Sequence, residues 1–133
     1  MPTLLKRESI KILIVDDDQA IREMLIEALT LNRDRPYLIE EAANGIEATI
    51  KLGTYRPDLL ILDIFMPEMD GLEVCRIIKN EVELSDMKVI VSTGYPDHTK
   101  LNEMAKLGFT NVISKPFDLM EFVKQVEDIL AAG

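Results

Sequence analysis

Five short runs of mostly apolar residues, each ending in polar residues, recur along the chain and predict β-strands. Residues 11–15 (Lys-Ile-Leu-Ile-Val) stop at three aspartates, and residues 58–62 (Asp-Leu-Leu-Ile-Leu) stop at Asp63. Short runs that are rich in branched side chains and apolar on both faces are typical of strands buried inside a parallel sheet. The other predicted strands are a weaker run at residues 37–39 and two further runs at residues 88–91 and 109–114.

A helical pattern follows each predicted strand. The first helix begins after Asp18, a suitable cap residue, and places on one face Ile21, Met24, Leu25, Ala28 and Leu29. The second opens at Asn44-Gly45, carries Ile46 and Ile50, and is predicted to end at Gly53. The third follows two turn-forming pairs, Met66-Pro67 and Asp70-Gly71, and its apolar residues are Leu72, Val74, Cys75 and Ile78.

The last two helices flank the fifth strand. Pro96 fits the first turn of the fourth helix, Gly108 ends it, and its apolar residues are Leu101, Met104, Ala105 and Leu107. Asp118 is predicted to cap the fifth helix, whose inward residues are Leu119, Phe122, Val123, Val126, Ile129 and Leu130. Strand and helix therefore alternate five times along the chain.

This alternation predicts an α/β fold in which helices cover both faces of a parallel sheet, joined by right-handed crossovers. A chain of 133 residues fits one domain, and no linker or repeat interrupts the pattern. In open sheets of this kind, ligands bind beyond the carboxyl ends of the strands. Those ends are therefore the place to look for a functional site.

Composition narrows the class of protein. A hydrophobic content of 47% with 29% charged residues indicates a globular domain rather than a disordered chain. The net charge of -9 argues against direct binding to nucleic acid or to an anionic membrane surface. Residues 1–9 have no apolar leader segment and no run of eighteen apolar residues occurs, so we expect a cytoplasmic protein. The single cysteine, Cys75, is expected to be a core residue.

Polar residues stand directly after four of the predicted strands. They are Asp16-Asp17-Asp18, Asp63, Ser92-Thr93 and Lys115. Parallel strands bring these ends to one edge, where two carboxylates about 5 Å apart repel by roughly 3 kcal/mol at an effective dielectric near 20. A cation is therefore expected. Oxygen ligands without nearby histidine or cysteine favour Mg²⁺, with Mn²⁺ as an alternative.

The pocket predicted at this edge suits phosphoryl chemistry. An ionised Asp63 can act as a nucleophile toward phosphorus and form an aspartyl phosphate. The metal and Lys115 would stabilise the charge on the phosphoryl oxygens, and Thr93 would add a hydroxyl donor. No general base is needed, so His98 is expected to be an ordinary surface residue. Taken alone, Asp18 is better explained as a helix cap than as a ligand.

These residues resemble the receiver domains of two-component response regulators. The matching motifs are Ile-Leu-Ile-Val-Asp-Asp-Asp at 12–18, Asp-Leu-Leu-Ile-Leu-Asp at 58–63 with Met66-Pro67 and Asp70-Gly71, Ser-Thr-Gly at 92–94, and Lys-Pro-Phe at 115–117. The resemblance implies a flavodoxin-like (βα)5 fold with strand order 2-1-3-4-5. It also implies a receiver domain at residues 11–130, an N-terminal extension at 1–10 and a tail at 131–133.

By this resemblance, Asp63 is the phosphoacceptor, and Asp16, Asp17, Asp63 and the backbone carbonyl of Phe65 hold the metal. Thr93 and Lys115 would bind the phosphoryl group, and the Lys115-Pro116 bond would be cis. The domain would be a signalling switch rather than an enzyme with a separate substrate, catalysing only its own phosphorylation and dephosphorylation. Its partners would be a histidine kinase or histidine phosphotransfer protein and a downstream effector protein or domain. Phosphorylation-dependent homodimer formation stays open.

Two positions bear on how such a switch works. Many receivers carry an aromatic ring three residues before the lysine, where this chain has Val112, so the threonine-to-ring relay is in doubt. Val112 is equally explained as strand core. Phe65 and Tyr95, two residues after Asp63 and Thr93, are bulky and should shield a phosphoryl group from water. We expect slow self-dephosphorylation, with output through the fourth helix, fifth strand and fifth helix.

Three other functions fit the sequence less well. An aspartate-dependent phosphatase usually needs a second aspartate where Phe65 stands. A flavin-binding protein needs a hydroxyl- and glycine-rich phosphate loop where Asp16 to Asp18 stand. A scaffold that keeps the fold without using the phosphate is the strongest alternative, although every pocket residue is present. Whether the chain is a stand-alone regulator or part of a longer one stays open.

Overall fold

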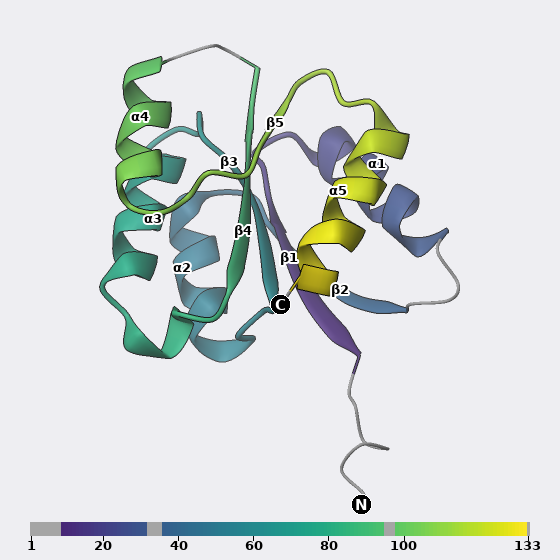
Figure 1. Cartoon of the computed structure of the whole chain (residues 1–133), viewed down its shortest axis with the longest axis horizontal. Coiled ribbons are helices and arrows are strands. Elements are labelled where there is room, and N and C mark those ends of the chain that lie inside the picture. Colours follow the sequence, from purple (N-terminus) through teal and green to yellow (C-terminus); the bar gives the residue numbers. More distant parts are fainter. Residues whose placement is uncertain (1–8, 32–35, 95–97, 133) are drawn as a thin grey trace, which may run out of the picture.

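A parallel sheet forms the centre of the molecule (Figure 1). The computed structural model describes residues 9–31, 36–94 and 98–132. Within these residues the sheet has five strands in the order β2-β1-β3-β4-β5, which confirms the predicted flavodoxin-like topology. The strands are β1 (Ile10–Val15), β2 (Tyr37–Ala42), β3 (Leu59–Asp63), β4 (Lys88–Thr93) and β5 (Val112–Ser114).

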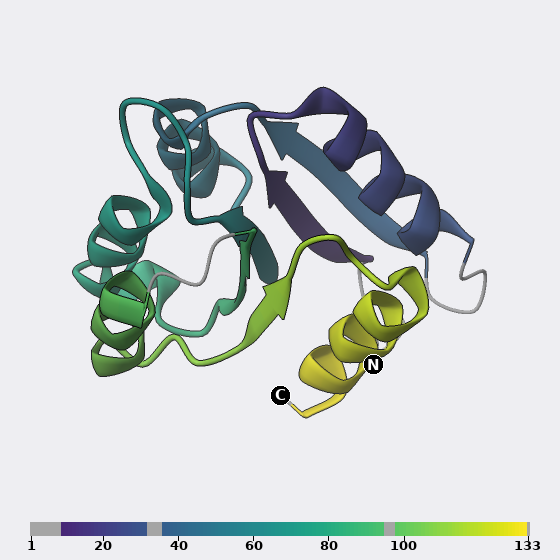
Figure 2. The same cartoon turned by 90° about the horizontal axis from the view of Figure 1, so that it is seen from above.

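Helices cover both faces of the sheet (Figure 2). They are α1 (Gln19–Thr30), α2 (Gly45–Thr54), α3 (Gly71–Lys79), α4 (His98–Lys106) and α5 (Leu119–Ala132), with a short 3₁₀ helix, η2 (Val82–Leu84). Helices α2, α3 and α4 pack on one face, and α1 and α5 pack on the other. Among the described helices, none has both the length and the apolar character needed to cross a membrane.

The core lies between the sheet and these two helical layers. Successive residues of a strand point to opposite faces, so Leu13 and Leu60 belong to one apolar cluster while Ile14 and Ile61 belong to the other. All five residues of β3 are buried, as expected of a central parallel strand. Cys75 is also buried, and burial followed by the charge of Asp70 raises the pKa of its thiol to about 12. The thiol is therefore protonated and structural.

Side-chain caps fix where the helices begin after the strand ends. Asp18 accepts a hydrogen bond from the Ala20 backbone N–H, as predicted for the cap of α1. Asn44 does the same for α2, Asp70 caps α3 through a capping box, and Asp118 caps α5. Each such cap stabilises a helix by about 1 kcal/mol. The loops after β1, β3 and β5 are therefore anchored where their helices begin.

The predicted end of α2 is wrong. The helix does not end at Gly53 but continues to Thr54, with the Tyr55 backbone N–H bonded to the Lys51 carbonyl. Ile46 and Ile50, the apolar residues noted for this helix, are 50% and 62% exposed. Ala48 and Leu52 form the buried face instead. Both pairs have i, i+4 spacing, so spacing alone does not select the buried pair.

The fifth strand and helix also differ from the prediction. β5 is only three residues long, because Gly108 adopts a left-handed φ of 98° and the Phe109 backbone N–H bonds back to the Met104 carbonyl. Val112 is exposed rather than part of the strand core, and Leu119 lies at the surface instead of facing inward. The predicted place of Pro96 in the first turn of α4 falls outside the described residues.

Candidate functional site

Three carboxylates meet at the carboxyl edge of the sheet. Asp16 and Asp17 follow β1, and Asp63 is the last residue of the neighbouring strand β3. One oxygen of each lies within 4.8 Å of the others. Asp16 and Asp63 are buried, with 2% and 3% of their surfaces exposed, whereas Asp17 is exposed. Solvent can therefore reach the cluster from the side of Asp17.

Lys115 brings positive charge to this cluster from the end of β5. Its Nζ atom lies 2.9 Å from Oδ2 of Asp16 and 3.3 Å from Oδ2 of Asp63. Its backbone N–H donates to the Thr93 carbonyl at 2.8 Å, which ties the loop after β5 to the end of β4. The Lys115-Pro116 peptide bond is cis, as the family resemblance implied. One ammonium group thus bridges the two buried carboxylates.

Backbone donors hold the remaining oxygens of these carboxylates. Oδ1 of Asp16 accepts a hydrogen bond from the Asp18 N–H at 2.9 Å. Oδ1 of Asp63 accepts a longer one from the Phe65 N–H at 3.3 Å. Asp16 therefore has two short contacts, whereas both contacts of Asp63 are long. This difference leaves Asp63 the less satisfied of the two buried groups.

Negative charge exceeds positive charge at the site, because three carboxylates share the ammonium group of Lys115. Burial, followed by the negative charge of Asp16, raises the pKa of Asp63 to about 6, although Lys115 and the Phe65 N–H oppose the shift. Burial alone would lower the pKa of Lys115, but its hydrogen bond to Asp16 and the charge of Asp63 outweigh this and raise it. Three carboxylates facing one ammonium group form a donor set that fits a hard divalent cation.

A cavity of about 650 Å³ opens onto these groups. Its polar lining comes from Asp16, Asp17, Asp18, Asp63 and Lys115, and its apolar walls are formed by Ile21, Met24, Phe65, Pro116 and Phe117. Pockets of this size hold small ligands. The cavity therefore has room for a phosphoryl group beside a metal ion, together with the incoming side chain of a donor.

The remaining predicted site residues lie around this cavity. Thr93 is buried at the end of β4, one residue beyond Ser92, which pairs with Asp63 across the sheet. Gly94, the next residue, lines the cavity together with Phe65. Tyr95, expected to shield the site, lies outside the described residues, as does the side chain of His98. The structure therefore brings the three carboxylates and Lys115 close together. Thr93 lies at the end of β4, the strand next to β3.

Gly71 has a role that its sequence context did not reveal. A Cβ atom at this position would lie 2.7 Å from the Asp63 carbonyl oxygen and 2.9 Å from the Ile64 Cα. The Gly71 N–H also donates to the Ile64 carbonyl at 2.8 Å. Only glycine permits this close approach of the start of α3 to the end of β3. The sequence showed Gly71 merely as a turn-forming residue.

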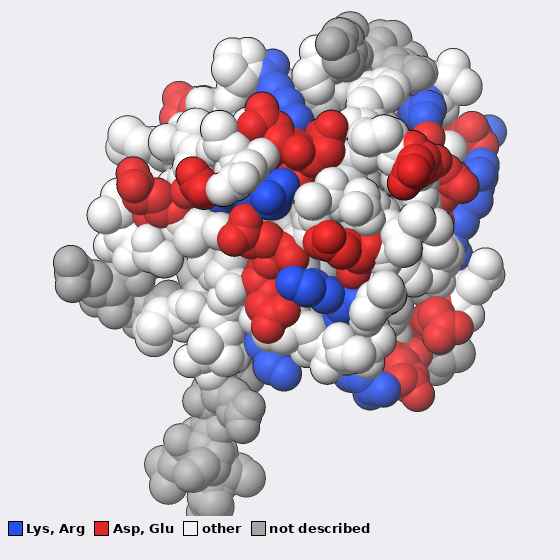
Figure 3. Space-filling model, turned by 180° about the vertical axis from the view of Figure 1, so that it is seen from behind, with Lys and Arg blue, Asp and Glu red and all other residues white. Residues whose placement is uncertain are grey.

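Arg22 is a second residue that the sequence did not single out. Its Nη1 donates to the Asp16 carbonyl at 2.7 Å, and its Nε donates to Glu41 at 2.9 Å. Lys51 adds a contact to the Glu41 carbonyl at 2.6 Å. Acidic and basic side chains are interspersed on the back of the molecule (Figure 3). This network ties the loop that carries Asp16 and Asp17 to strand β2.

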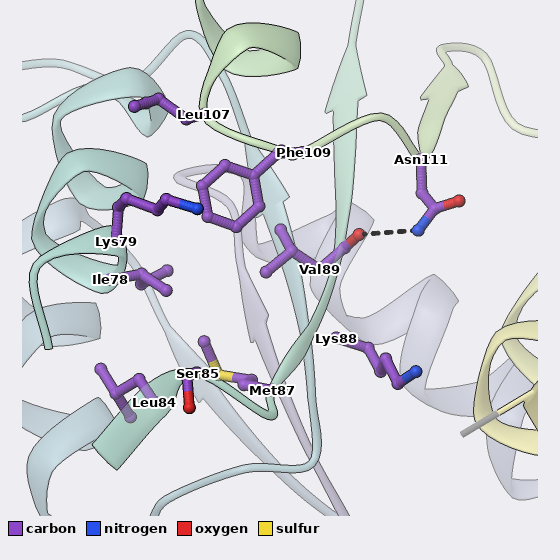
Figure 4. Close-up of a pocket in the computed structure, with 11 residues that line it drawn as sticks. Ile78, Lys79, Leu84, Ser85, Met87, Lys88, Val89, Leu107, Phe109 and Asn111 are labelled. Carbon is purple, nitrogen blue, oxygen red and sulfur yellow. Dashed lines mark hydrogen bonds between the residues drawn. The ribbon is translucent and has the colours of Figure 1, made fainter. Parts of the chain in front are cut away.

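A second hollow, of about 300 Å³, lies at the opposite end of β4 (Figure 4). In this view Lys79 extends toward the ring of Phe109, and the Asn111 amide donates to the Val89 carbonyl at 3.4 Å. The side chains of Ser85 and Lys88 point away from the centre of the hollow. Among the described residues that line it there is no carboxylate or thiol, in contrast to the cavity at the carboxyl edge.

The fold and the acidic pocket together define a class of protein: a doubly wound domain with a carboxylate cluster at the strand ends that could hold a metal ion. Residues 12–127 match the response regulator receiver domain family. The chain therefore belongs to this family, which confirms the resemblance drawn from its motifs.

Individual relatives agree with this assignment. The response regulator MprA of Mycobacterium ulcerans (strain Agy99) is 36% identical over 122 residues, which cover 92% of this chain and 50% of that protein. The chain thus spans about half the length of the curated relatives it matches. The solved structures it resembles include a putative response regulator from Chloroflexus aurantiacus J-10-fl, with 30% identity, a TM-score of 0.83 and coverage of 93% and 99% of the two chains. The chemotaxis response regulator CheY4 of Vibrio cholerae has 30% identity, a TM-score of 0.81 and coverage of 92% and 99%.

Proposed function

We propose that the chain is a phosphorylation-dependent switch in which Asp63 accepts a phosphoryl group from a histidine kinase or histidine phosphotransfer protein. The observation that carries this proposal is the meeting of Asp63 with Asp16, Asp17 and Lys115 at the mouth of one cavity. The raised pKa of Asp63 supports it, because the pocket is short of positive charge. Perturbed carboxylates in a cleft are typical of functional sites.

The divalent cation is proposed to be Mg²⁺, which Mn²⁺ can replace. Asp16, Asp17, Asp63 and the backbone carbonyl of Phe65 would hold it. All four donors are oxygen atoms, as hard cations prefer. When bound, the metal supplies positive charge that offsets the charge on the phosphoryl oxygens. It also removes the repulsion between Asp16 and Asp63.

The transfer itself is a displacement at phosphorus. A carboxylate oxygen of Asp63 forms a bond to phosphorus while the bond from phosphorus to the donor's imidazole nitrogen breaks, and the electron pair leaves with that nitrogen. Asp63 is ionised for most of the time at neutral pH, since its pKa is about 6. No general base is therefore needed. Lys115 and Thr93 are proposed to bind the phosphoryl oxygens, so that positioning and charge supply the catalysis. The domain catalyses only its own phosphorylation and dephosphorylation.

The signal is proposed to leave through α4, β5 and α5. Thr93 is the last residue of β4, which precedes α4 in the chain, and Lys115 directly follows β5 and precedes α5. Shifting the ratio of active to inactive form from 1:99 to 99:1 requires the phosphoryl group to favour the active form by about 5.5 kcal/mol of interaction free energy. One charge-assisted contact and one hydroxyl contact supply only part of this. Val112 offers no ring to swing inward, so we expect a graded switch with some active form present before phosphorylation.

The same proposal covers the partners, the cellular location and the domain bounds of the chain. The partners are a kinase or phosphotransfer protein upstream and an effector protein or domain downstream, in the cytoplasm. The proposal does not include direct binding to nucleic acid or to a membrane, because a net charge of -9 opposes binding to anionic surfaces. The receiver is proposed to span residues 11–130, with an extension at 1–10 and a tail at 131–133. Phosphorylation-dependent homodimer formation is compatible with this arrangement.

The proposed function is tested by incubating the protein with acetyl phosphate and Mg²⁺ and measuring its intact mass. The expected result is the gain of one phosphoryl group, and EDTA should prevent it. Titration with Mg²⁺ followed by calorimetry should show one site. If the mass stays unchanged and no Mg²⁺ binds, the chain is a scaffold that keeps the receiver fold without using it.

The shielding role of Phe65 gives a prediction about phosphate lifetime. Phe65 lines the cavity, and the Lys100 Nζ lies 5.3 Å from its ring centroid, which limits how far the ring can turn away. Replacing Phe65 with asparagine admits water, so loss of phosphate should become about fivefold faster. The decay of the phosphorylated mass with time measures this. Phe65→Leu keeps an apolar wall and should decay nearly as slowly as wild type; an unchanged or longer lifetime in Phe65→Asn would contradict the shielding.

The Arg22 network gives a prediction about metal affinity. Arg22→Gln removes the donor to the Asp16 carbonyl, so Mg²⁺ should bind about tenfold more weakly, in the range seen for groups that orient metal ligands. Loss of the arginine charge beside Glu41 would by itself favour a cation, so weaker Mg²⁺ binding reports positioning rather than charge. Calorimetric titration measures the affinity. Arg76→Gln removes an exposed ion pair with Glu103 and serves as control. Equal affinities in the two variants would show that Arg22 does not position the ligands.

A further inference from the structure

Lys100 on α4 reaches across to the loop that follows β3. Its Nζ atom forms an ion pair with Oδ2 of Asp70 and lies 5.3 Å from the centroid of the Phe65 ring. Lys100 and Asp70 are both half-buried, with 27% and 23% of their side chains exposed. Salt screens a partly buried pair less than an exposed one. One ammonium group therefore holds two residues of the loop that begins directly after Asp63.

Asp70 holds Lys100 while it also caps α3. Its Oδ1 atom accepts a hydrogen bond from the Glu73 backbone N–H at 3.1 Å, which leaves Oδ2 for Lys100. Burial alone would raise the pKa of Asp70, but the hydrogen bonds from Lys100 and from the Glu73 N–H outweigh this and lower it. Asp70 is therefore ionised at neutral pH, and the cap and the ion pair exist together.

Phe65 connects this ion pair to the carboxylate cluster. Phe65 forms part of the wall of the cavity onto which Asp63 opens, and its backbone N–H donates to Oδ1 of Asp63 at 3.3 Å. A cation over the face of an aromatic ring is attracted by the negative charge of that face. Asp70 fixes the ammonium group of Lys100, so this attraction favours one position of the Phe65 ring.

The backbone of the same loop is held from the other side by α2. A Cβ atom at Gly45 would lie 2.5 Å from the Met69 carbonyl oxygen, so the start of α2 approaches the loop closely. The Thr49 hydroxyl lies 3.7 Å from the sulfur of Met69. A change at Lys100 is therefore expected to release the side chain of Phe65 and to leave the backbone of the loop in place.

We infer that Lys100 is a positioning residue that holds the Phe65 ring in the cavity wall and so limits how easily water reaches a phosphoryl group on Asp63. The inference rests on the proposed phosphoryl transfer to Asp63 and adds to it the residue that sets the lifetime of the phosphorylated state. Lys100 belongs to α4, so the position of this helix is linked to that lifetime.

The step that Lys100 controls is hydrolysis of the aspartyl phosphate. A water oxygen forms a bond to phosphorus while the bond from phosphorus to the Asp63 oxygen breaks. The electron pair stays on the carboxylate, a water proton passes to solvent, and inorganic phosphate leaves. A ring that keeps water away from phosphorus slows this step.

A second ion pair offers a matched control. Arg76 on α3 pairs with Glu103 on α4 at 3.0 Å, and both side chains are exposed, by 52% and 45%. The pair joins the same two helices that Lys100 and Asp70 join (Figure 2). If Lys100 only fastened α4 to α3, breaking either pair would have a similar effect. Only the loss of Lys100 is expected to change the position of Phe65.

The first test measures how fast the phosphorylated mass decays after acetyl phosphate is removed. Lys100→Met keeps the length of the side chain and removes its charge, so phosphate loss should become about threefold faster. Lys100→Arg keeps the cation and should restore the wild-type lifetime. Asp70→Asn keeps a capping oxygen but loses the charge that holds Lys100, so it should also shorten the lifetime. Arg76→Gln should leave it unchanged.

A double-mutant cycle then asks whether Lys100 acts through the ring. Phe65→Leu leaves no aromatic face for the ammonium group. In that background, Lys100→Met should change the rate of phosphate loss by less than about 1.5-fold.

A second readout does not require phosphorylation. Protein made with 4-fluorophenylalanine gives one fluorine signal for each of its four phenylalanines, and the signal missing in Phe65→Leu belongs to Phe65. The difference in its chemical shift between H₂O and D₂O, measured in EDTA, reports the exposure of the ring to solvent. This difference should increase in Lys100→Met and keep its wild-type value in Lys100→Arg and Arg76→Gln.

Several results would overturn the inference. They are an unchanged lifetime in Lys100→Met or Asp70→Asn, equal losses in Lys100→Met and Arg76→Gln, no rescue by Lys100→Arg, and an equal loss in the Phe65→Leu background. An unchanged solvent isotope shift in Lys100→Met would also overturn it. A wild-type chain that gains no phosphoryl group would refute the proposed function and with it the effect on lifetime, whereas the fluorine signal would still decide whether Lys100 positions the ring.

Discussion

Replacing Asp63 with asparagine should stabilise the metal-free protein by about 2 kcal/mol at neutral pH, even though it removes the residue on which the proposed function depends. The fold raises the pKa of this buried carboxyl from 3.8 to about 6. A shift of this size corresponds to at most about 3 kcal/mol, since one pKa unit is worth about 1.4 kcal/mol. For a domain of this length, the melting temperature should rise by roughly 5–10 °C.

The pH dependence identifies the cause. Between about pH 4 and pH 6 the folded state keeps a proton on Asp63 that the unfolded state has lost, so wild-type stability falls as pH rises through this window. The advantage of Asp63→Asn should therefore be absent below pH 4, grow up to pH 6 and stay constant above it. Thermal melts in EDTA across this range measure it, and Asp17→Asn, at an exposed position, is the control. A variant less stable than wild type at pH 7 would contradict the charge argument.

Replacing Lys115 with methionine should have the opposite effect and destabilise the metal-free protein by about 2 kcal/mol. Breaking one side of a buried ion pair costs about 3–5 kcal/mol. The loss should be smaller here, because Asp63 can take up a proton when the ammonium group is gone. Lys115 contacts both Asp16 and Asp63, so both carboxylates lose their cation. Urea unfolding in EDTA at pH 7 measures the change.

Three comparisons isolate the cause of that loss. In an Asp63→Asn background, Lys115→Met should cost clearly less, because one of the two charge pairs is already absent. Lys124→Met breaks an exposed pair with Asp128 and should change stability by less than about 0.5 kcal/mol. Millimolar Mg²⁺ should restore part of the stability lost in Lys115→Met. An equal cost in both backgrounds would show that Lys115 stabilises the fold through packing instead of charge.

The sequence predicted the meeting of the carboxylates and Lys115 well because the topology of a parallel sheet leaves little freedom. Once the apolar runs ending at Asp16 and Asp63 are recognised as neighbouring parallel strands, the two carboxylates must share an edge. Lys115 follows from the same rule, since it stands after the last strand. Its contacts with both carboxylates are the consequence of strand order and register.

Other features depend on tertiary packing that no local pattern encodes. Ile46 and Ile50 matched a helical face as well as Ala48 and Leu52 did, and only the position of α2 against the sheet distinguishes them. The place of Arg22 depends on strand β2 lying beside β1, which brings Glu41 within reach.

Surface features were predicted least well. Leu119 was assigned to the inward face of its helix because it continues the apolar spacing, yet α5 is turned so that Leu119 and Met120 line a groove beside α1. A helix's apolar stripe does not reveal which of its edges the neighbouring helix covers. The groove therefore appears only in the folded chain.

The central claim, that Asp63 carries the phosphoryl group, is tested most directly by locating that group after reaction with acetyl phosphate and Mg²⁺. Borohydride reduction converts an aspartyl phosphate to homoserine, which peptide mass mapping assigns to one residue. We predict homoserine at position 63 of the wild-type chain and no phosphoryl gain in Asp63→Asn. A modification mapped to Asp16, Asp17 or His98, or undiminished phosphoryl gain in Asp63→Asn, would contradict the claim.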